Sequence, residues 1–444
     1  MKINAVLLRK IVKAAERLGA SDVVVSSHEN MWQMIRFSNN RITVSKNGST
    51  TAIEAYVSVK GRRALQSTTD VSPKSLDELV KNVVATAKSA PQPDVYAPLP
   101  EGPFKYSKEL LKPVSDDVTS DMLVGYVEEA VNSGLENGAT RVAGSLVYSR
   151  GRTRLFTNAD VEATASSMGL EISVRAFAAD DATGHFVSVA GDPKEFNPRQ
   201  AGAKAGEIAK MALNPVEGEA GVYEGLLGFM TFAHLLEQVG SWASAFYVDG
   251  EMSFLTGLLG QEPASKVFSL YDDPTLKGTY GATPFDDEGL PTRRNIIFED
   301  GILKTYLHNS TTAKKFNTSS TANAGLIVPH PFNLVCKPGD KPFDKLISSI
   351  DNGIWITNDW YLRYQNYRTG EFSTIPRDGL FLIKNGGVEK PLKGLRLSDN
   401  IVNILKGIRA LSSEAYWIRT WEITLPTYAP AAVVEKVNFT TSVK

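Results

Sequence analysis

Apolar and polar positions in the first part of the chain predict a helix, several antiparallel strands and a second helix. Apolar side chains at residues 6–18 recur at helical spacing, and Gly19 is typical of the residue that follows a helix. A second helix is predicted to begin near Ser72, because Ser75 and Glu78 fit a capping box and an apolar stripe follows them. Between the helices, alternation predicts strands at residues 22–26, 34–37, 42–45, 51–59 and, after a turn at 60–62, at 63–68.

The same order of elements returns after a proline-rich break. Prolines concentrated at residues 90–103 exclude a regular helix there and suit an extended linker. Beyond the linker we predict a helix at residues 120–134 capped by Ser120, and another at residues 198–213 with Asn197 as its N-cap. The repeated order indicates a duplication of architecture, without visible sequence identity between the two units. The strands predicted in this second unit are residues 141–149, 153–158, 161–167, 171–179 and 185–190, with a turn at 150–152.

From residue 221 onward, short strand-like segments outnumber helical ones. The βαβ alternation of a parallel sheet is missing, so we expect an α+β fold with mainly antiparallel sheet. N-terminal units of helix and antiparallel sheet are expected to precede a large β-rich C-terminal domain. The clearest helical segments of this last region are residues 232–242, 311–315, 343–350 and 401–408. The predicted domains are an N-terminal α/β domain at 1–90, a Pro-rich linker at 91–117, a central α+β domain at 118–215 and a β-rich domain at 216–444.

The composition is that of an ordinary soluble globular protein. The chain has 444 residues and a formal net charge of −1, so no basic field favours nucleic-acid binding. No apolar run approaches the roughly 20 residues of a membrane-spanning helix, and the apolar start is too short for a secretory signal. Cys336 is the single cysteine, which excludes an intrachain disulfide and a thiolate metal cage. We expect a cytoplasmic protein without a nucleic-acid or membrane partner.

The most informative segment is an apolar helix at residues 233–241 that carries one carboxylate. Two imidazoles would bind zinc in a helix of this kind, but their positions hold Leu236 and Ser241. Leucine has no lone pair, and a serine hydroxyl is a poor zinc ligand. Glu237 keeps the position of a general base, which has little to do without a metal-activated water. We interpret Glu237 as a solvated or ion-paired carboxylate; His234, on nearly the same helix face, makes with it only a weak two-ligand metal candidate.

The other candidate residues have structural interpretations that we prefer. Asp286, Asp287 and Glu288 crowd into a predicted turn, where carboxylates commonly cap backbone N–H groups. The alternative for this acidic run is a site for a cation or a substrate amine. A structural role is also the preferred interpretation of His28, His185, His308, His330, Cys336 and the arginines within 150–154 and at 293 and 294.

Residues 280–294 (YGATPFDDEGLPTRR) resemble the TldD/PmbA family, once described as modulators of DNA gyrase. The resemblance extends over essentially the whole chain. TldD-like members are zinc metallopeptidases with a His-Glu-x-x-x-His helix and a later cysteine ligand. Here Leu236 and Ser241 replace the histidines, and residues 416–428 contain no cysteine, so the chain resembles the PmbA/TldE-like members that lack the zinc motif. Further matching segments are residues 298–304, 321–325, 333–340 and 393–400.

The resemblance implies a non-catalytic subunit that pairs with a TldD-like zinc metallopeptidase in degrading or processing peptides. We expect no cofactor in this chain, zinc in the partner, and no activity of this chain alone. A strand edge could hold an extended peptide through main-chain hydrogen bonds. Two alternatives stay open: a free-standing metal-dependent peptidase with a rearranged site that uses His234 and Glu237, and a regulator of DNA gyrase. Self-association as a homodimer without the partner also stays open.

Overall fold

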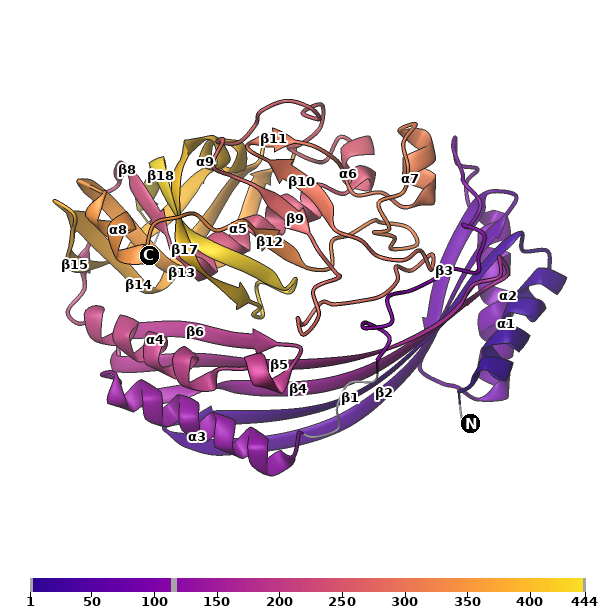
Figure 1. Cartoon of the computed structure of the whole chain (residues 1–444), viewed down its shortest axis with the longest axis horizontal. Coiled ribbons are helices and arrows are strands. Elements are labelled where there is room, and N and C mark those ends of the chain that lie inside the picture. Colours follow the sequence, from indigo (N-terminus) through magenta and orange to yellow (C-terminus); the bar gives the residue numbers. More distant parts are fainter. Residues whose placement is uncertain (1–2, 113–117, 442–444) are drawn as a thin grey trace.

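A curved six-stranded sheet lies beneath a larger β-rich region in the computed structural model, which describes residues 3–112 and 118–441 (Figure 1). The fold is α+β with mainly antiparallel pairing, as predicted. The helices of the first half are α1 (Ala5–Arg17), α2 (Pro73–Ser89), α3 (Ser120–Glu136) and α4 (Pro198–Met211). The strands of the curved sheet are β1 (Asp22–Ser38), β2 (Arg41–Val59), β3 (Arg62–Thr68), β4 (Arg141–Thr157), β5 (Glu162–Ala179) and β6 (Ala182–Ala190).

One sheet unites the segments on both sides of the proline-rich stretch. Its strand order is β3-β2-β1-β4-β5-β6, with β1 paired antiparallel to both β2 and β4. The two helix-and-sheet units read from the sequence therefore share a continuous set of backbone hydrogen bonds. The domain limits stay a prediction.

The strands are longer than the hydrophobic pattern predicted. The predicted break between residues 26 and 34 lies inside β1, and the predicted turn at 150–152 lies inside β4, so both are wrong. The chain reverses instead at Asn39 and Asn40, whose φ angles of 49° and 65° suit a tight hairpin turn. Side chains in the middle of these strands are mostly exposed or only partly buried. Neither face of the sheet is covered there, so no apolar alternation marks the strand.

Helix caps differ from the prediction at two positions. The N-cap of α2 is Ser72, whose hydroxyl accepts a hydrogen bond from the Ser75 backbone N–H, so the predicted capping box of Ser75 with Glu78 is wrong. The N-cap of α3 is Thr119, one residue before the predicted cap Ser120, and its hydroxyl accepts a hydrogen bond from the Met122 backbone N–H. The predicted cap Asn197 is confirmed for α4.

The helices cover the convex face of the sheet only at its two ends. Helices α1 and α2 pack on alternate residues of β1 such as Val23 and Val25, and α3 and α4 share a core with Ile35 and Phe37. Between these ends, Met31 of the same strand is 64% exposed. The opposite, concave face is turned toward the β-rich region (Figure 1).

The β-rich region is a twelve-stranded sheet with one helix buried inside it. This helix, α5 (Phe229–Trp242), is apolar on nearly all sides, which is the pattern of a helix surrounded by protein. The other helices are α6 (Ala245–Asp249), α7 (Ser310–Lys315), α8 (Phe343–Ser348) and α9 (Ile401–Gly407). The strands are β7 (Val216–Glu217), β8 (Gly221–Leu227), β9 (Leu270–Asp272), β10 (Asn295–Glu299), β11 (Ile302–Leu303), β12 (Leu334–Cys336), β13 (Asn352–Asn366), β14 (Glu371–Lys384), β15 (Gly387–Lys393), β16 (Leu395–Asn400), β17 (Ile408–Ile418) and β18 (Thr427–Thr441).

The four helices predicted in this region are confirmed with small shifts at their ends, and the short α6 was missed. In the part of the chain that the structure describes, no helix combines the length and the apolar character needed to cross a membrane.

The contact between α3 and α4 predicts opposite effects for two glycine substitutions. A Cβ on Gly202 of α4 would lie 2.1 Å from the Ala130 carbonyl oxygen, whereas a Cβ on Gly125 of α3 would meet nothing within 4 Å. We expect Gly202→Ala to lower the free energy of unfolding by about 1–3 kcal/mol. The matched control Gly125→Ala should raise it by about 0.5–1 kcal/mol. Denaturant unfolding of the full chain measures both; equal effects would contradict this account of the helix contact.

Candidate functional site

Helix α5 places the predicted motif positions in the interior of the β-rich region. Leu236 is fully buried in the apolar core, and Ser241 lies partly buried in the last turn. The helix presses closely on β12, because a Cβ on Gly240 would come within 2.5 Å of the Leu334 side chain. Leu236, at one of the two positions expected to carry a metal-binding imidazole, is thus used for packing.

The Glu237 carboxylate anchors a loop. Its Oε1 accepts hydrogen bonds from the Thr424 backbone N–H at 2.8 Å, the Thr424 hydroxyl at 3.0 Å and the Leu425 backbone N–H at 2.9 Å. Burial raises the pKa of Glu237, although these hydrogen bonds and His234 oppose the shift. The carboxylate thus accepts hydrogen bonds from a segment that is far away in the sequence. Its role is to hold the 424–425 loop in place.

His234 lies near carboxylates that come from two other places in the chain. Its Nδ1 is 2.9 Å from Asp359 Oδ2, and its Nε2 is 3.7 Å from Glu422 Oε2. The Thr374 hydroxyl donates to the same Asp359 oxygen at 2.6 Å. Sequence reasoning missed Asp359, Glu422 and Thr374, since no local spacing links them to His234. The one available signal was the polar pair at 358–359 inside an otherwise apolar strand.

The charge around His234 favours the imidazolium form. Burial by itself would lower the pKa of His234, but Asp359, through its charge and hydrogen bond, together with Glu237 and Glu422 outweighs burial and raises it. A proton on His234 therefore supplies a positive charge amid these carboxylates.

These side chains do not fit a zinc site. His234 Nδ1 already contacts Asp359, Glu237 Oε1 is taken up by loop donors, and Leu236 offers no ligand atom. Across residues 3–112 and 118–441, no cluster of three or more His, Cys, Asp and Glu side chains has the arrangement of a metal site. The expectation that catalysis and metal binding are absent from this chain stays a prediction.

The acidic run at residues 286–288 is a buried turn with partners. Asp286 accepts from the backbone N–H groups of Glu288, Leu290 and Ala324, as the capping interpretation expected. Glu288 accepts from the Ser310 hydroxyl at 2.5 Å and from its backbone N–H. Burial is the largest cause that raises the pKa of Glu288 to about 7.

Asp287 is the member of this run without a side-chain hydrogen bond in the described structure. Burial raises its pKa to about 6. Its charge also helps raise the pKa of Glu54 on β2, which shows that the turn faces the curved sheet.

The remaining histidines and the cysteine belong to segments other than α5. His185 contacts the Ser173 hydroxyl at 2.7 Å and the Asn358 amide at 3.0 Å, beside buried Asp378. Cys336 is fully buried, which raises the pKa of its thiol and disfavours a thiolate nucleophile. Burial lowers the pKa of His308 to about 4, whereas His28 and His330 are exposed residues.

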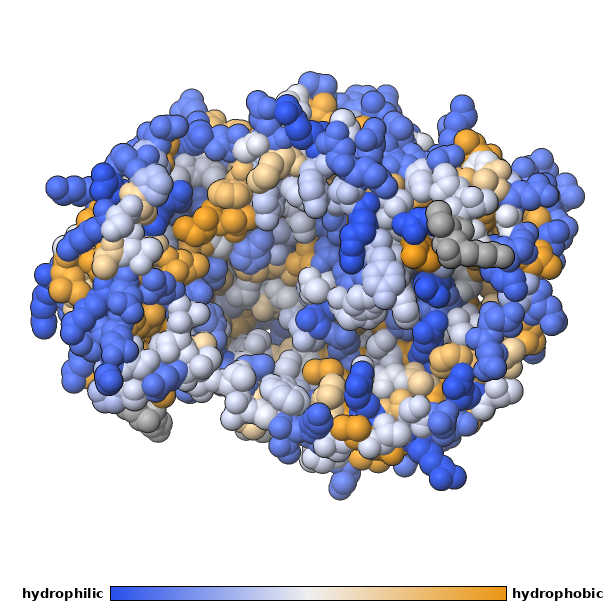
Figure 2. Space-filling view, turned by 180° about the vertical axis from the view of Figure 1, so that it is seen from behind, coloured by the Kyte–Doolittle hydropathy of each residue, from blue (hydrophilic) through white to orange (hydrophobic). Residues whose placement is uncertain are grey.

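The concave face of the sheet forms a hollow beneath the β-rich region, and the space-filling view from behind shows the depression (Figure 2). Residues Gly48, Trp32, Ser149 and Gly169 lie opposite one another on neighbouring strands and make a row across this face. The Trp32 ring lies over Gly48, where a Cβ would be 2.7 Å from the ring, and Gly169 lies against Tyr280. The two glycines thus make room for aromatic rings that lie against this face.

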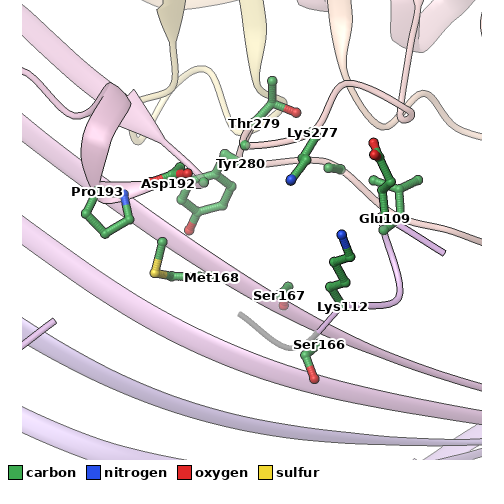
Figure 3. Close-up of a pocket in the computed structure, with 14 residues that line it drawn as sticks. Glu109, Lys112, Ser166, Ser167, Met168, Asp192, Pro193, Lys277, Thr279 and Tyr280 are labelled. Atoms are coloured by element: carbon green, nitrogen blue, oxygen red, sulfur yellow. The ribbon is translucent and has the colours of Figure 1, made fainter. Parts of the chain in front are cut away.

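A pocket of about 190 Å³ lies at the side of the hollow (Figure 3). Met168 and Ser166 of β5 line one side, and Lys277 and Tyr280 line the other. Lys112, also in the lining, directly precedes residues 113–117, which lie outside the described part of the chain. We therefore assign this pocket no ligand.

The fold defines a two-sheet α+β protein with one helix, α5, buried in its β-rich region. Comparisons with known proteins agree with this class. The model of the PmbA/TldA metallopeptidase C-terminal domain matches residues 220–441. A metalloprotease of Methanocaldococcus jannaschii is 33% identical over 187 residues, which cover 40% of this chain and 40% of that protein. The matches span 40 to 45% of the first three curated relatives.

Solved structures match nearly the whole chain. A Thermotoga maritima protein described as a modulator of a DNA gyrase has a TM-score of 0.83 and 23% identity, covering 97% of this chain and 99% of that one. TldE from Thermococcus kodakarensis gives a TM-score of 0.83 at 19% identity with the same coverage. These identities establish a shared fold alone. Because the family model matches half of the chain, this protein belongs to the TldD/PmbA family.

The environment of His234 predicts a distinct titration among the five histidines. Its imidazole should titrate above the usual value of about 6.5, and the other four should titrate below it, with the pKa of His308 lowered to about 4. A raised folded-state pKa contributes stability that is fully present below the unfolded value and is lost as pH rises through the folded value. Two-dimensional NMR of the imidazole resonances measures each titration, and His234→Gln identifies the signal. A midpoint for His234 below that of an exposed histidine would contradict the carboxylate arrangement.

The raised pKa of Asp287 predicts that Asp287→Asn increases the free energy of unfolding in a pH-dependent way. Its raised pKa favours the protonated folded state, so this contribution is lost as pH rises through about 6. Asp287→Asn should therefore increase the free energy of unfolding by about 1–3 kcal/mol at pH 8 and have little effect near pH 4. Denaturant titrations at both pH values test this, with exposed Asp94→Asn as the control. The same gain at both pH values would show that charge burial is not the cause.

Proposed function

We propose that this protein is a non-catalytic, TldE-like subunit that pairs with a TldD-like zinc metallopeptidase and takes part in peptide degradation or processing in the cytoplasm. The observation that carries the proposal is the state of helix α5. Leu236 packs in the core, Glu237 accepts hydrogen bonds from the 424–425 loop and His234 contacts Asp359, so these three positions have a structural use.

Glu237 does not have the setting of a general base. A base must reach the proton that it removes, directly or through one water. The Oε1 atom of Glu237 is instead directed at three donors of the loop. Family membership and the name of the TldE structure support a role beside a catalytic partner, and zinc chemistry belongs to that partner in this proposal.

The concave face of the curved sheet is the surface that we assign to peptide. The rings of Trp32 and Tyr280, which lie over Gly48 and Gly169, offer apolar contacts on this face. Main-chain hydrogen bonds to an extended peptide are available at the edge strands β3 and β6, because the inner strands are paired on both sides. A subunit of this kind would contribute positioning, while bond cleavage takes place on the partner.

Measurements of metal content and peptidase activity test whether the TldD-like partner, and not this chain, carries out cleavage. The purified chain should contain well under one zinc per molecule and should not cleave an unstructured peptide alone. Activity should appear when a TldD-like chain is added, and Glu237→Gln in this chain should leave it unchanged, because glutamine keeps an acceptor oxygen for the loop. Zinc analysis, peptide cleavage followed by mass spectrometry and size-exclusion chromatography of the mixture provide the measurements.

A matched variant on the partner serves as the control. Substitution of the partner's own motif glutamate should abolish cleavage while the two chains still elute together. Stoichiometric zinc in this chain, or cleavage by it alone, would instead support the free-standing peptidase. Loss of cleavage in the mixture on Glu237→Gln, with assembly intact, would contradict the positioning role of Glu237.

A further inference from the structure

A second, apolar cavity lies where α4 of the central unit meets the β-rich region. Its volume is about 370 Å³, and none of its lining residues belongs to the His234 group. The elements around it are α4, the start of α5, α8, β13 and β17, which lie together on one side of the molecule (Figure 1). A cavity of this size suits a ligand with one large side chain.

The wall of the cavity is a continuous set of aromatic rings. Phe229 contacts both Tyr416, at a centroid distance of 4.8 Å, and Phe343, at 5.3 Å. Phe343 in turn lies 5.2 Å from Trp355, and Phe186 lies 5.3 Å from Tyr416. Edge-to-face packing of this kind fixes the rings and creates a rigid apolar surface.

One ammonium group lies at this wall without an anionic partner. The Nζ of Lys204 lies over the rings of Tyr416, Phe229 and Phe186 at 5.0, 5.8 and 5.6 Å. Within the described chain, no carboxylate comes within 4.0 Å of this nitrogen, whereas Arg199 of the same helix pairs with Glu136 at 2.8 Å. The Trp355 indole N–H is also buried without a hydrogen-bond partner among described residues.

Three carboxylates line the cavity together with Lys204. Glu414 accepts hydrogen bonds from the Phe343 backbone N–H at 3.0 Å and from the Ser413 hydroxyl. Glu207 and Asp344 also line the cavity, and both residues are exposed. A cationic ligand would meet the ammonium that already occupies the aromatic surface, whereas an anion with an apolar body would complement both features.

We propose that this cavity binds the free C-terminal carboxylate and apolar last side chain of a peptide. The carboxylate pairs with Lys204, and the side chain lies against the aromatic wall. This assignment of a peptide end, rather than of another apolar acid, rests on the proposed function. Binding here would retain a peptide or a cleavage product by its end, at a place separate from the concave face.

Calorimetry on the full chain alone tests the proposal, independently of any peptidase partner. N-acetylphenylalanine and the tripeptide Gly-Gly-Phe should bind, and the corresponding amides should bind at least about tenfold more weakly, because a charge-assisted hydrogen bond is lost. Lys204→Met, which keeps an apolar stem, should weaken binding of both acids by a similar factor. Lys210→Met, an exposed position of the same helix outside the cavity lining, is the matched control and should leave affinity unchanged.

A second variant guards against a folding defect in Lys204→Met. Met211→Glu alters a lining residue that is 39% exposed and should weaken binding of the acids by charge repulsion. Equal binding of acids and amides, or binding of neither, would overturn the proposal. Binding of N-acetylphenylalanine without binding of Gly-Gly-Phe would show a small-acid site and overturn the peptide assignment. Failure of the proposed function would appear separately, as a mixed complex without cleavage despite normal binding here.

Discussion

The centre of this protein depends on ion pairs between buried side chains. An ion in an apolar interior carries a desolvation penalty of several kcal/mol unless a counter-ion and hydrogen bonds offset it. Here the partners come from distant segments. His234 meets Asp359, and Arg175 of the curved sheet donates to Asp378 of β14 at 2.7 Å. Each pair ties one element to another, so satisfying charge also fixes the relative positions of the elements.

Helix α5 illustrates how such a constraint can replace catalytic chemistry. The motif glutamate, Glu237, survives as an acceptor for the 424–425 loop, and Leu236 adds to the core. The positive charge near this helix is the proton of His234, shared among carboxylates from β13 and from the loop that contains Glu422. The proposed role as a positioning subunit follows from this exchange of a reactive arrangement for a structural one.

The curved sheet connects this interior to the surface that we assign to peptide. Its long strands carry helices at both ends of the convex side, while the concave side faces the β-rich region. Glu171 forms an ion pair with Arg419, whose guanidinium lies over the Tyr280 ring at 4.5 Å. These contacts hold the sheet against the region above it and leave the hollow beside them. The cavity around Lys204 lies at another junction of the same two bodies.

The helices were predicted well, whereas the strand lengths were not. The reason is that a periodic pattern of apolar residues appears only where one face of an element is buried. The buried stripe of α2 reads directly from the sequence, because one face of that helix packs on the sheet. The middle of β1 and β4 has no buried face, so the turn predicted at 150–152 filled a stretch where alternation was absent. Those residues are extended because they pair with neighbouring strands. The local sequence does not indicate this pairing.

The sequence by itself determined the family of the protein, and it predicted that Leu236 and Ser241 stand where zinc ligands would be, since the identity of a side chain needs no coordinates. Only the tertiary structure decided which contacts residues such as His234 and Lys204 make. Asp359 and Glu422 reach His234 across more than a hundred positions of chain, and Lys204 meets its aromatic rings across a junction between sheets. Contacts of that kind depend on strand register and on how layers pack, and neither is written in the local pattern of residues.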